Sequence, residues 1–426
     1  MSPRGSSAIR GAIVAFAAAA LAACGGNGGA SVSCDDAPCC GPRCGETPPV
    51  ELGDLGRFTH LAPLSDGRLA IATYDATKKN MIVIVERPDG TERTVHVVDG
   101  WRPSTDALGD RLVDVDAGRW ATLAVGADDA IHVAWFDADE GELHYARGDA
   151  DAGFASVEVV DGDGPATRGT HASLALDDAG LPHIAYRDET RKNLRYARRD
   201  ARGAWQTRAI DGCAGEPGCP VAGSEDFGEW AALAFVPAVG GGVAPRIAFY
   251  DRFRGDLKMA AQAGDGSWVT STLDGRDPVT FADQGDVGRF ASVASTPTRQ
   301  LGIAYFDVTR GTLRYLSPGA GPRTVDDGRR LTRAGAARRD AVGQFVRLAY
   351  DDTGRAHFVY ADGSVPGLRH AVVVGEAAAN VTALDVPAGG WIDFVVGDDG
   401  GLVGAYGAFL PDAAPRTRLQ LFTVAP

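Results

Sequence analysis

Short runs of five or six residues, in which apolar and polar side chains alternate, recur along the chain from about Gly56 to the C-terminus. Turns rich in Asp and Gly separate these runs, as at Asp66-Gly67 and Asp177-Asp178-Ala179-Gly180. The apolar residues do not follow the 3.6-residue period of a helix. Alternation with a period of two is typical of strands that have one face toward a core. The pattern therefore predicts an all-β structure.

The runs group into a repeat of roughly fifty-five residues, and each copy has room for four short strands. An aspartate ends the second strand in six copies, and Tyr406-Gly407-Ala408 stands at the seventh place without the acid. Repeated four-stranded units that cannot bury both faces alone are typical of a β-propeller. We therefore predict seven four-stranded blades, or six if the weak last copy does not form one. The marker aspartates are Asp75, Asp137, Asp188, Asp251, Asp307 and Asp362.

The last copy ends one strand short, after Leu419-Gln420-Leu421-Phe422. Near the start of the chain, Val50-Glu51-Leu52-Gly53-Asp54 resembles the ends of other fourth strands, such as Val97-Val98-Asp99-Gly100. We expect this N-terminal strand to complete the last blade, because closing the ring removes exposed sheet edges. The propeller would then occupy residues 49–426 as one domain.

The repeat consensus is Ser-Leu-Ala-Leu-Asp, then Gly-x-Pro-His-Ile-Ala-Tyr-x-Asp, then Leu-Arg-Tyr-Ala, as in the copy that begins at Ser173. It resembles repeats of uncharacterised exported propeller proteins of bacteria, and the resemblance covers nearly the whole mature chain. The resemblance implies a fold and little more. The chain lacks the sialidase Asp-box, Ser-x-Asp-x-Gly-x-x-Trp, and the Gly-His and Trp-Asp pairs of WD repeats, so neither family's function carries over.

The N-terminus has the features of an export signal. Two arginines, Arg4 and Arg10, accompany an apolar run from Ala12 to Leu21 that is too short to span a bilayer as a helix. The run leads into Leu21-Ala22-Ala23-Cys24, which resembles the lipobox of bacterial lipoproteins. The resemblance implies a lipoprotein signal peptide over residues 1–23, lipidation of Cys24, and anchorage at the bacterial cell envelope, on the outer membrane or cell surface. A plain secretory signal with an incidental cysteine is the alternative.

Residues 24–48 are rich in Gly, Pro, Ser and Cys, and we expect them to be a tether outside the folded core. Six cysteines remain besides Cys24, and an even number in an exported protein indicates disulfides. Cys213 and Cys219 are predicted to form a local bridge in a long loop between blades. The tether cysteines could instead bind zinc, although they lack the paired C-x2-C spacing that zinc usually requires. They are Cys34, Cys39, Cys40 and Cys44.

Charge and motifs exclude several classes of function. The formal net charge is -14, which argues against nucleic acid, because binding a phosphate backbone requires clustered Lys and Arg. The sequence contains no nucleophile elbow, His-Glu-x-x-His helix, phosphate loop or dinucleotide fingerprint, so no catalytic residue and no cofactor is predicted. Asp-rich turns resemble calcium loops only weakly, since the closing Glu is missing. Calcium is therefore a weak possibility, and no metal ligand is assigned.

Candidate binding residues gather at one end of the predicted ring. In an antiparallel blade, the first strand starts where the second strand ends, and we call this side of the ring the mouth face. Each unit begins there with Gly-x-aromatic, in which the middle residue varies. Arg57, Arg119 and Arg289 could together grip a carboxylate or sulfate. Alternatively, each could pair with a neighbouring acid, such as Asp54, Asp116 or Asp286. The seven triplets begin at Gly56, Gly118, Gly169, Gly228, Gly288, Gly343 and Gly389.

The aromatic residue of the triplet is nearly constant. It could be a platform for stacking sugars, but a repeated position more simply serves the repeated packing between blades. Glu229 and Gln344 occupy the variable position in two other units. The candidate ligand-binding residues are Arg57, Arg119, Trp120, Glu229, Trp230, Arg289, Gln344 and Trp391.

Two other recurrent residues have simpler structural interpretations. The aspartate at each second-strand end is expected to accept backbone N–H bonds from the following turn. The alternative is a ring of carboxylates that binds a cation or acts as acid and base, but no pair is marked out as a glycosidase would require. His132, His183 and His357 lie five residues before the aspartate on three separate blades, which favours ordinary strand residues over a zinc site.

Three functions are compatible with these features. The first is a membrane-tethered, extracytoplasmic module that binds a glycan, another ligand or a protein partner at the mouth face without turning it over. The second is a carbohydrate-active hydrolase or lyase that uses the same face. The third is a passive surface scaffold. Propellers host all three, so the fold alone does not choose among them.

Overall fold

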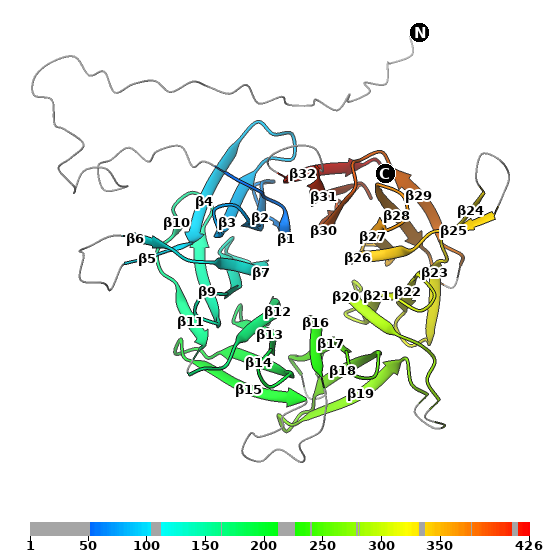
Figure 1. Cartoon of the computed structure of the whole chain (residues 1–426), viewed down its shortest axis with the longest axis horizontal. Helices are drawn as coiled ribbons and strands as arrows, with labels where there is room; N and C mark the ends of the chain where they lie inside the picture. Colours follow the sequence, from blue (N-terminus) through cyan, green and yellow to red (C-terminus); the bar gives the residue numbers. More distant parts are fainter. Residues whose placement is uncertain are drawn as a thin grey trace, which may run out of the picture. The chain divides into compact units, whose positions relative to one another are not determined.

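The computed structural model describes residues 52–426 except 104–111, 163, 212–225, 239–240, 278–279, 281, 332–336, 376 and 411–415. The described residues form no helix; they form seven antiparallel sheets arranged in a ring (Figure 1). The predicted all-β, seven-bladed propeller is therefore confirmed. Residues Glu51–Pro426 form one compact unit. In the part of the chain that is described, no helix is long and apolar enough to cross a membrane.

The first four blades follow one another along the chain. Blade 1 contains β1 (Arg57–Pro63), β2 (Leu69–Asp75), β3 (Asn80–Glu86) and β4 (Arg93–Asp99). Blade 2 contains β7 (Ala117–Val125), β8 (Ile131–Asp137), β9 (Glu142–Asp149) and an outer strand in two pieces, β10 (Gly153–Phe154) and β11 (Glu158–Asp161). Blade 3 contains β12 (Arg168–Leu176), β13 (Pro182–Asp188), β14 (Asn193–Arg199) and β15 (Trp205–Asp211). Blade 4 contains β16 (Phe227–Pro237), β17 (Val243–Asp251), β18 (Asp256–Gln262) and β19 (Trp268–Asp274).

The last three blades complete the ring. Blade 5 contains β20 (Val287–Ser295), β21 (Leu301–Asp307), β22 (Thr312–Leu316) and β23 (Pro322–Asp326). Blade 6 contains β26 (Val342–Tyr350), β27 (Ala356–Asp362), β28 (Leu368–Val373) and β29 (Asn380–Leu384). Blade 7 contains β30 (Gly389–Val396), β31 (Leu402–Phe409) and β32 (Thr417–Val424). Two small hairpins lie in connections between blades: β5 (Trp101–Pro103) with β6 (Leu112–Asp114), and β24 (Arg329–Leu331) with β25 (Ala337–Arg339).

Burial decreases from the middle of each blade toward its outer edge. Every residue of β2, β8 and β13 is buried, because second strands lie between two neighbouring blades and are covered on both faces. Outer strands such as β15 and β29 are largely exposed or half-buried. The first strand of each blade lies innermost, around the centre of the ring (Figure 1). The residues that can form a central site therefore come from seven different blades.

The ring closes differently from the expectation. Blade 7 has three strands among the described residues, and Leu52–Asp54 forms no strand beside β32. Val50 and Glu51, the rest of the expected strand, lie outside the described residues. The described residues 52–54 therefore do not show the N-terminal strand that was expected to complete blade 7.

Side-chain packing and turn contacts join the N-terminal segment to the ring instead. Leu52 packs in a cluster with Leu419 and Leu421 of blade 7. The backbone N–H of Gly53 donates to Asp75 Oδ2 at 2.6 Å, at the end of β2. Because this N–H binds the β2–β3 turn of blade 1, it is not available to a ladder with β32. Closure also uses β1, which lies between β7 and β30 (Figure 1).

A β-bulge interrupts the start of every first strand. In blade 2, Arg119 pairs with Phe136 and Thr122 pairs with Ala134, so two residues, Trp120 and Ala121, lie opposite one. The same shift occurs in the other six blades. Bulges change the direction in which a side chain points. Here they turn the aromatic residue of each Gly-x-aromatic triplet toward the centre of the ring.

Buried ion pairs join neighbouring blades near the mouth face. Asp326, at the end of β23, accepts bonds from Tyr360 Oη at 2.7 Å and Arg369 Nη1 at 3.0 Å, both in blade 6. We call this arrangement, a fourth-strand aspartate bound to a basic residue on the third strand of the next blade, the interblade latch. Such a buried carboxylate depends on its partners, because an unpaired buried charge is costly. The other latches pair Asp99 with His144, Asp161 with Arg195, Asp211 with Lys258, and Asp274 with Arg314.

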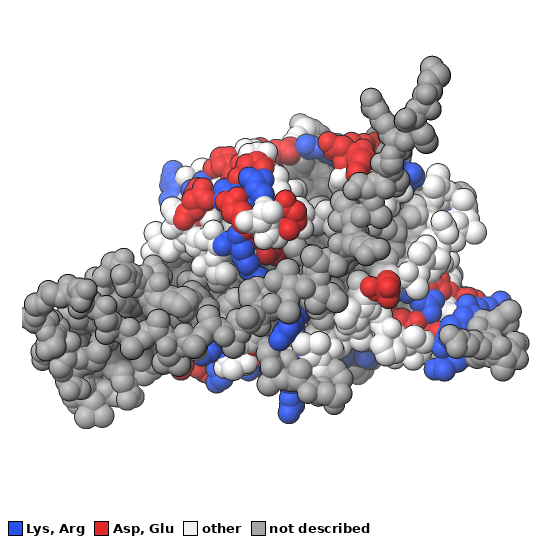
Figure 2. All heavy atoms as spheres, turned by 90° about the horizontal axis from the view of Figure 1, so that it is seen from above, with Lys and Arg blue, Asp and Glu red and all other residues white. Residues whose placement is uncertain are grey.

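Charge is mixed over the molecular surface. Figure 2 shows acidic and basic side chains interspersed on the side in view. Many are close ion pairs, such as Arg68 with Asp151 at 2.6 Å and Arg147 with Asp128 at 2.7 Å.

Candidate functional site

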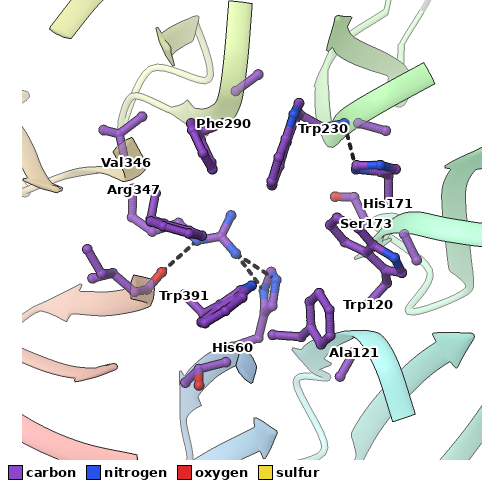
Figure 3. A pocket seen from close by; sticks show the side chains of 17 residues that line it. His60, Trp120, Ala121, His171, Ser173, Trp230, Phe290, Val346, Arg347 and Trp391 are labelled. Atoms are coloured by element: carbon purple, nitrogen blue, oxygen red, sulfur yellow. Dashed lines mark hydrogen bonds between the residues drawn. The ribbon is translucent and has the colours of Figure 1, made fainter. Parts of the chain in front are cut away.

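Seven ring-shaped side chains form a closed annulus at the centre of the propeller, one from the start of each first strand (Figure 3). Consecutive rings contact one another around the whole circle, with centroids 3.8–5.8 Å apart. We call this set the aromatic annulus. Its members are Phe58, Trp120, His171, Trp230, Phe290, Phe345 and Trp391.

The local backbone positions each member of the annulus. All seven have a positive φ between 49° and 55°, which is unusual for residues with large side chains. The preceding glycine allows the bulge. In blade 2, Gly118 has φ 122°, and a Cβ on it would lie 2.8 Å from Met81 Cα of blade 1. The glycine of the triplet therefore allows close packing against the neighbouring blade, and the bulge orients the aromatic side chain.

His171 is the one histidine of the annulus, and the other six members are Phe or Trp. Its Nδ1 accepts the backbone N–H of Trp230 at 3.0 Å, so the proton of the neutral ring lies on Nε2. Burial lowers the pKa of His171 well below its usual value, and the positive charges of Arg187 and Arg252 lower it further. His171 is therefore neutral at pH 7 and behaves as a ring of the annulus with one N–H donor.

The annulus surrounds a cavity of about 80 Å3 that is open to solvent. Small or apolar residues that follow the annulus members, such as Ala121, Ala172 and Val346, form part of its wall. Among the described residues, two charged or titratable side chains besides His171 line it: His60 and Arg347. No described carboxylate side chain is part of the lining.

The residue two positions after each annulus member has a recurrent role. In three blades it is a hydroxyl residue whose oxygen accepts a backbone N–H from the next blade, at 3.0–3.1 Å. In blade 7 it is Asp393, which accepts the N–H of Leu61 at 2.9 Å. These bonds satisfy backbone groups near the bulge and join adjacent first strands. The hydroxyl pairs are Thr122 with Leu174, Ser173 with Leu233, and Ser292 with Leu348.

Three adjacent blades carry charged or titratable groups at the same position, although Asp393 among them still accepts a backbone N–H from the next blade. Arg347 of blade 6 donates from Nη2 to His60 Nε2 at 2.6 Å and from Nε to the carbonyl of Ile392 at 2.9 Å (Figure 3). Asp393 of blade 7 lies 3.7 Å from Arg347 Nε and 3.6 Å from His60 Nδ1. We call His60, Arg347 and Asp393 the polar sector. Packing of the repeat does not require it, because the other four blades have small residues there.

Burial sets the protonation tendencies of the polar sector. It lowers the pKa of His60 well below its usual value, and the charge of Arg347 lowers it further. His60 is therefore neutral at pH 7, with Nε2 as the acceptor from Arg347. Burial raises the pKa of Asp393, although Arg347 and the N–H groups of Leu61 and Phe394 act in the opposite direction. Arg347 is the fixed positive charge of the cavity.

The predicted site residues divide into two groups. Trp120, Trp230 and Trp391 belong to the annulus and line the cavity. The five residues at the variable position of the triplet are not part of the lining. The structure thus brings the three tryptophans together and separates them from the predicted polar residues, which are Arg57, Arg119, Glu229, Arg289 and Gln344.

The arginines of the variable position are mostly paired with acids. Arg119 Nε lies 3.0 Å from Asp116 Oδ1, and Arg289 Nη2 lies 3.1 Å from Asp286 Oδ2. Both pairs are the ones expected from the sequence as the alternative to ligand binding. The guanidinium of Arg57 instead lies over the ring of Trp391, 5.9 Å from its centroid.

The other two variable residues also have neighbours within the propeller. Glu229 Oε1 accepts Arg252 Nη1 at 3.0 Å. The amide of Gln344 lies beside Gly363 in the β27–β28 turn. The five residues therefore do not converge on one point as the anion grip would require.

The recurrent aspartates close the turns after the second strands, as predicted. Asp251, for example, accepts the N–H groups of Phe253 and Arg254, both at 3.0 Å. His132 and His183 each bind a tyrosine hydroxyl of the same blade, Tyr145 and Tyr196. His357 binds His370 in its own blade, so these histidines do not converge on one zinc site.

Two groups in the described part of the chain have the donor types for a metal, and they share His144; the second consists of Glu140, Glu142 and His144 and is partly exposed. Asp99, Asp137 and His144 place ligand atoms within 4.8 Å of one another, and all three are buried. Asp99 also accepts the indole N–H of Trp135 at 3.1 Å, as the equivalent latch aspartates accept tyrosine hydroxyls. This group is therefore explained as one of the interblade latches.

Several predictions fall outside the described residues. They concern the signal peptide, the lipidated Cys24, the tether over residues 24–48 and the bridge between Cys213 and Cys219.

The sequence reasoning missed the polar sector. His60, Arg347 and Asp393 could have been found by aligning the seven copies two residues after the aromatic. Four copies have Thr, Ser, Ala and Ser there, and the other three have charged or titratable residues.

Comparison with known proteins concerns the fold. No known protein family and no curated protein matches the chain. Among solved structures, it is similar to the α-L-arabinofuranosidase Arb93A from Fusarium graminearum, with 12% identity over 77% of this chain and 97% of that one, and a TM-score of 0.46. The polysaccharide lyase Uly1 shows 11% identity, coverage of 88% and 90%, and a TM-score of 0.49. AofleA from Arthrobotrys oligospora shows 14% identity over 79% of this chain and 88% of that one, and a TM-score of 0.42. Similarity at this level bears on the fold alone.

Proposed function

We propose that this protein is a membrane-tethered, extracytoplasmic propeller that binds a carbohydrate ligand in its central cavity and does not turn it over. The observation that carries the proposal is the closed aromatic annulus around a solvent-open cavity with Arg347 and His60 in its wall. Concave sites with aromatic walls and a few placed polar groups are typical ligand sites. Ring faces offer stacking area, and the polar groups offer hydrogen bonds to hydroxyl groups.

The lining favours binding over catalysis. Most glycosidases place two carboxyl groups on either side of the bond that they cleave. In the described part of the chain, no Asp or Glu lines the cavity, and Asp393 lies behind Arg347 with its oxygens bound to backbone N–H groups. A hydrolase of this two-carboxylate kind therefore has no acid–base pair among the described residues that line the cavity.

Binding is tested on a glycan array with the full chain purified in detergent. We expect Trp120→Ala and Trp391→Ala to weaken binding about tenfold or more, because buried tryptophans dominate many binding sites. Phe253→Ala is the matched control, since this aromatic is 57% exposed and lies outside the cavity lining. Equal losses in all three variants, or no glycan binding by the unsubstituted protein, would contradict the proposal.

The membrane tether is a separate part of the proposal and rests on the sequence. Leu21-Ala22-Ala23-Cys24 supports lipidation, and residues 24–48 would hold the propeller away from the lipid. We expect Cys24→Ser to move the protein from the membrane fraction to the soluble fraction, with Cys34→Ser as control. A Cys24→Ser protein that stays with membranes would show that the lipid anchor is wrong.

A further inference from the structure

Arg347 departs from the repeat at a position that carries a small residue in four other blades. The equivalent residues in blades 2, 3, 4 and 5 are Thr122, Ser173, Ala232 and Ser292, all small. A long cationic side chain at this position costs side-chain entropy and desolvation. It is also half-buried in the wall of the cavity rather than at the outer surface. A role toward a bound molecule would account for its presence.

The hydrogen bonds of Arg347 hold one side of the guanidinium and leave another open. A guanidinium has five N–H donors. One on Nε binds the Ile392 carbonyl at 2.9 Å, and one on Nη2 binds His60 Nε2 at 2.6 Å. No described residue accepts a hydrogen bond from Nη1. Both N–H groups of Nη1 therefore remain for a partner in the cavity. Nη2 lies 2.6 Å from Nε2 and 3.5 Å from Nδ1 of His60 and has one further N–H.

The electrostatic surroundings leave that open side positive. Asp393 lies 3.7 Å from Nε, on the side of the guanidinium that is already bound. It is not part of the cavity lining, and its oxygens accept the N–H groups of Leu61 and Phe394. His60 is neutral because its Nε2 is the acceptor. The cavity thus presents one oriented guanidinium edge framed by aromatic rings.

We propose that the ligand carries a carboxylate, which the Nη1 and Nη2 edge of Arg347 binds in bidentate fashion. Guanidinium and carboxylate match in planarity and spacing, and charge-assisted pairs of this kind are the strong ones. Together with the annulus, this chemistry selects an acidic saccharide of the uronic-acid type. The inference rests on the proposed function, since it specifies the ligand of the same cavity.

The test is an array printed in matched pairs, in which each uronic-acid oligosaccharide stands beside its carboxyl-reduced, neutral form. The full chain in detergent is expected to bind acidic members at least about tenfold more tightly than their neutral partners, because only these occupy Arg347. Arg347→Gln is expected to lower affinity for acidic members about 10- to 100-fold and for neutral members much less, so that the preference for acidic members is lost. Arg347→Lys is expected to lie between, since it keeps the charge but loses the fork.

Arg119→Gln is the matched control, because Arg119 is paired with Asp116 outside the cavity lining. Equal binding of acidic and neutral members by the unsubstituted protein would overturn the carboxylate and leave the proposed function standing. Equal losses of both members in Arg347→Gln would do the same. Binding of neither kind would overturn both proposals. The comparison of acidic with neutral members needs no variant, so it holds even if Arg347→Gln does not fold.

Discussion

At the scale of single residues, the centre of this propeller shows how one repeated position can serve both packing and recognition. Six blades place Phe or Trp in the annulus, and blade 3 places His171. The imidazole keeps the ring contacts, with centroids 3.8 Å from Trp120 and 5.1 Å from Trp230. It also adds a hydrogen bond to the backbone of Trp230. The annulus is therefore tolerant of ring chemistry while its geometry stays constant.

This tolerance gives a pH-dependent prediction for His171→Phe. Phe occupies the equivalent place in three other blades, so the variant should fold, and at pH 7 it should lose about 1 kcal/mol because the Trp230 N–H loses its acceptor. The pKa of His171 is lowered in the folded state, so the unfolded chain takes up a proton first as the pH falls below about 6.5. The unsubstituted protein thereby loses stability on acidification.

The variant lacks that loss of stability. The difference in the free energy of unfolding between the two proteins should therefore shrink below pH 6.5 and reverse by about pH 5, a change of about 2 kcal/mol. Equilibrium urea unfolding at pH 7 and pH 5 measures it. Other buried histidines, such as His60, are present in both proteins and cancel in the comparison. A difference that does not change with pH would show that His171 is protonated in the folded state.

At the scale of elements, two devices repeat with the blades. The bulge at the start of each first strand turns a ring toward the centre, and the interblade latch near the end of the fourth strand joins one blade to the next. Both lie toward the mouth face, where first strands start and fourth strands end. Arg119 and Arg289 lie toward the same face, but each pairs with the acid three residues before it and is not part of the cavity lining.

From the interblade latch we expect Asp161→Asn to lower the stability of the propeller strongly. Asp161 is buried and accepts Arg168 Nη1 at 2.7 Å and Arg195 Nε at 2.9 Å. The neutral amide leaves these buried guanidinium groups short of a counter-charge, and we expect a loss of about 3 kcal/mol in the free energy of unfolding. Asp128→Asn is the control, because its pair with Arg147 is more than half exposed and should contribute less than about 1 kcal/mol. Similar losses in urea unfolding for both variants would contradict the latch.

At the scale of the whole molecule, sevenfold repetition builds a ring and a small departure from it builds the candidate site. The annulus is complete around the circle, but the polar sector comes only from blades 6, 7 and 1. These blades also flank the place where the ends of the propeller meet. Leu52 and the β32 leucines close that place by packing, so blade 7 stays three-stranded in the described residues.

The sequence by itself determined the all-β class, the propeller and the turn-closing aspartates, and it favoured seven blades over six, because strand alternation and Asp-Gly turns are local signals that repeat in register. It also marked the Gly-x-aromatic triplets, and with them the tryptophans of the cavity. Only the tertiary structure decided that the aromatic residue of each triplet, and not the variable residue before it, points toward the centre of the ring. A bulge changes the direction of a side chain without changing the pattern of residues. Tertiary contacts also paired Arg119 with Asp116, brought His60 to Arg347 across 287 positions of sequence, and left Leu52–Asp54 outside the last sheet. These contacts depend on which backbone and side-chain groups lie close enough to bind the same partner. Segments that are distant in the sequence come close together only in the folded structure.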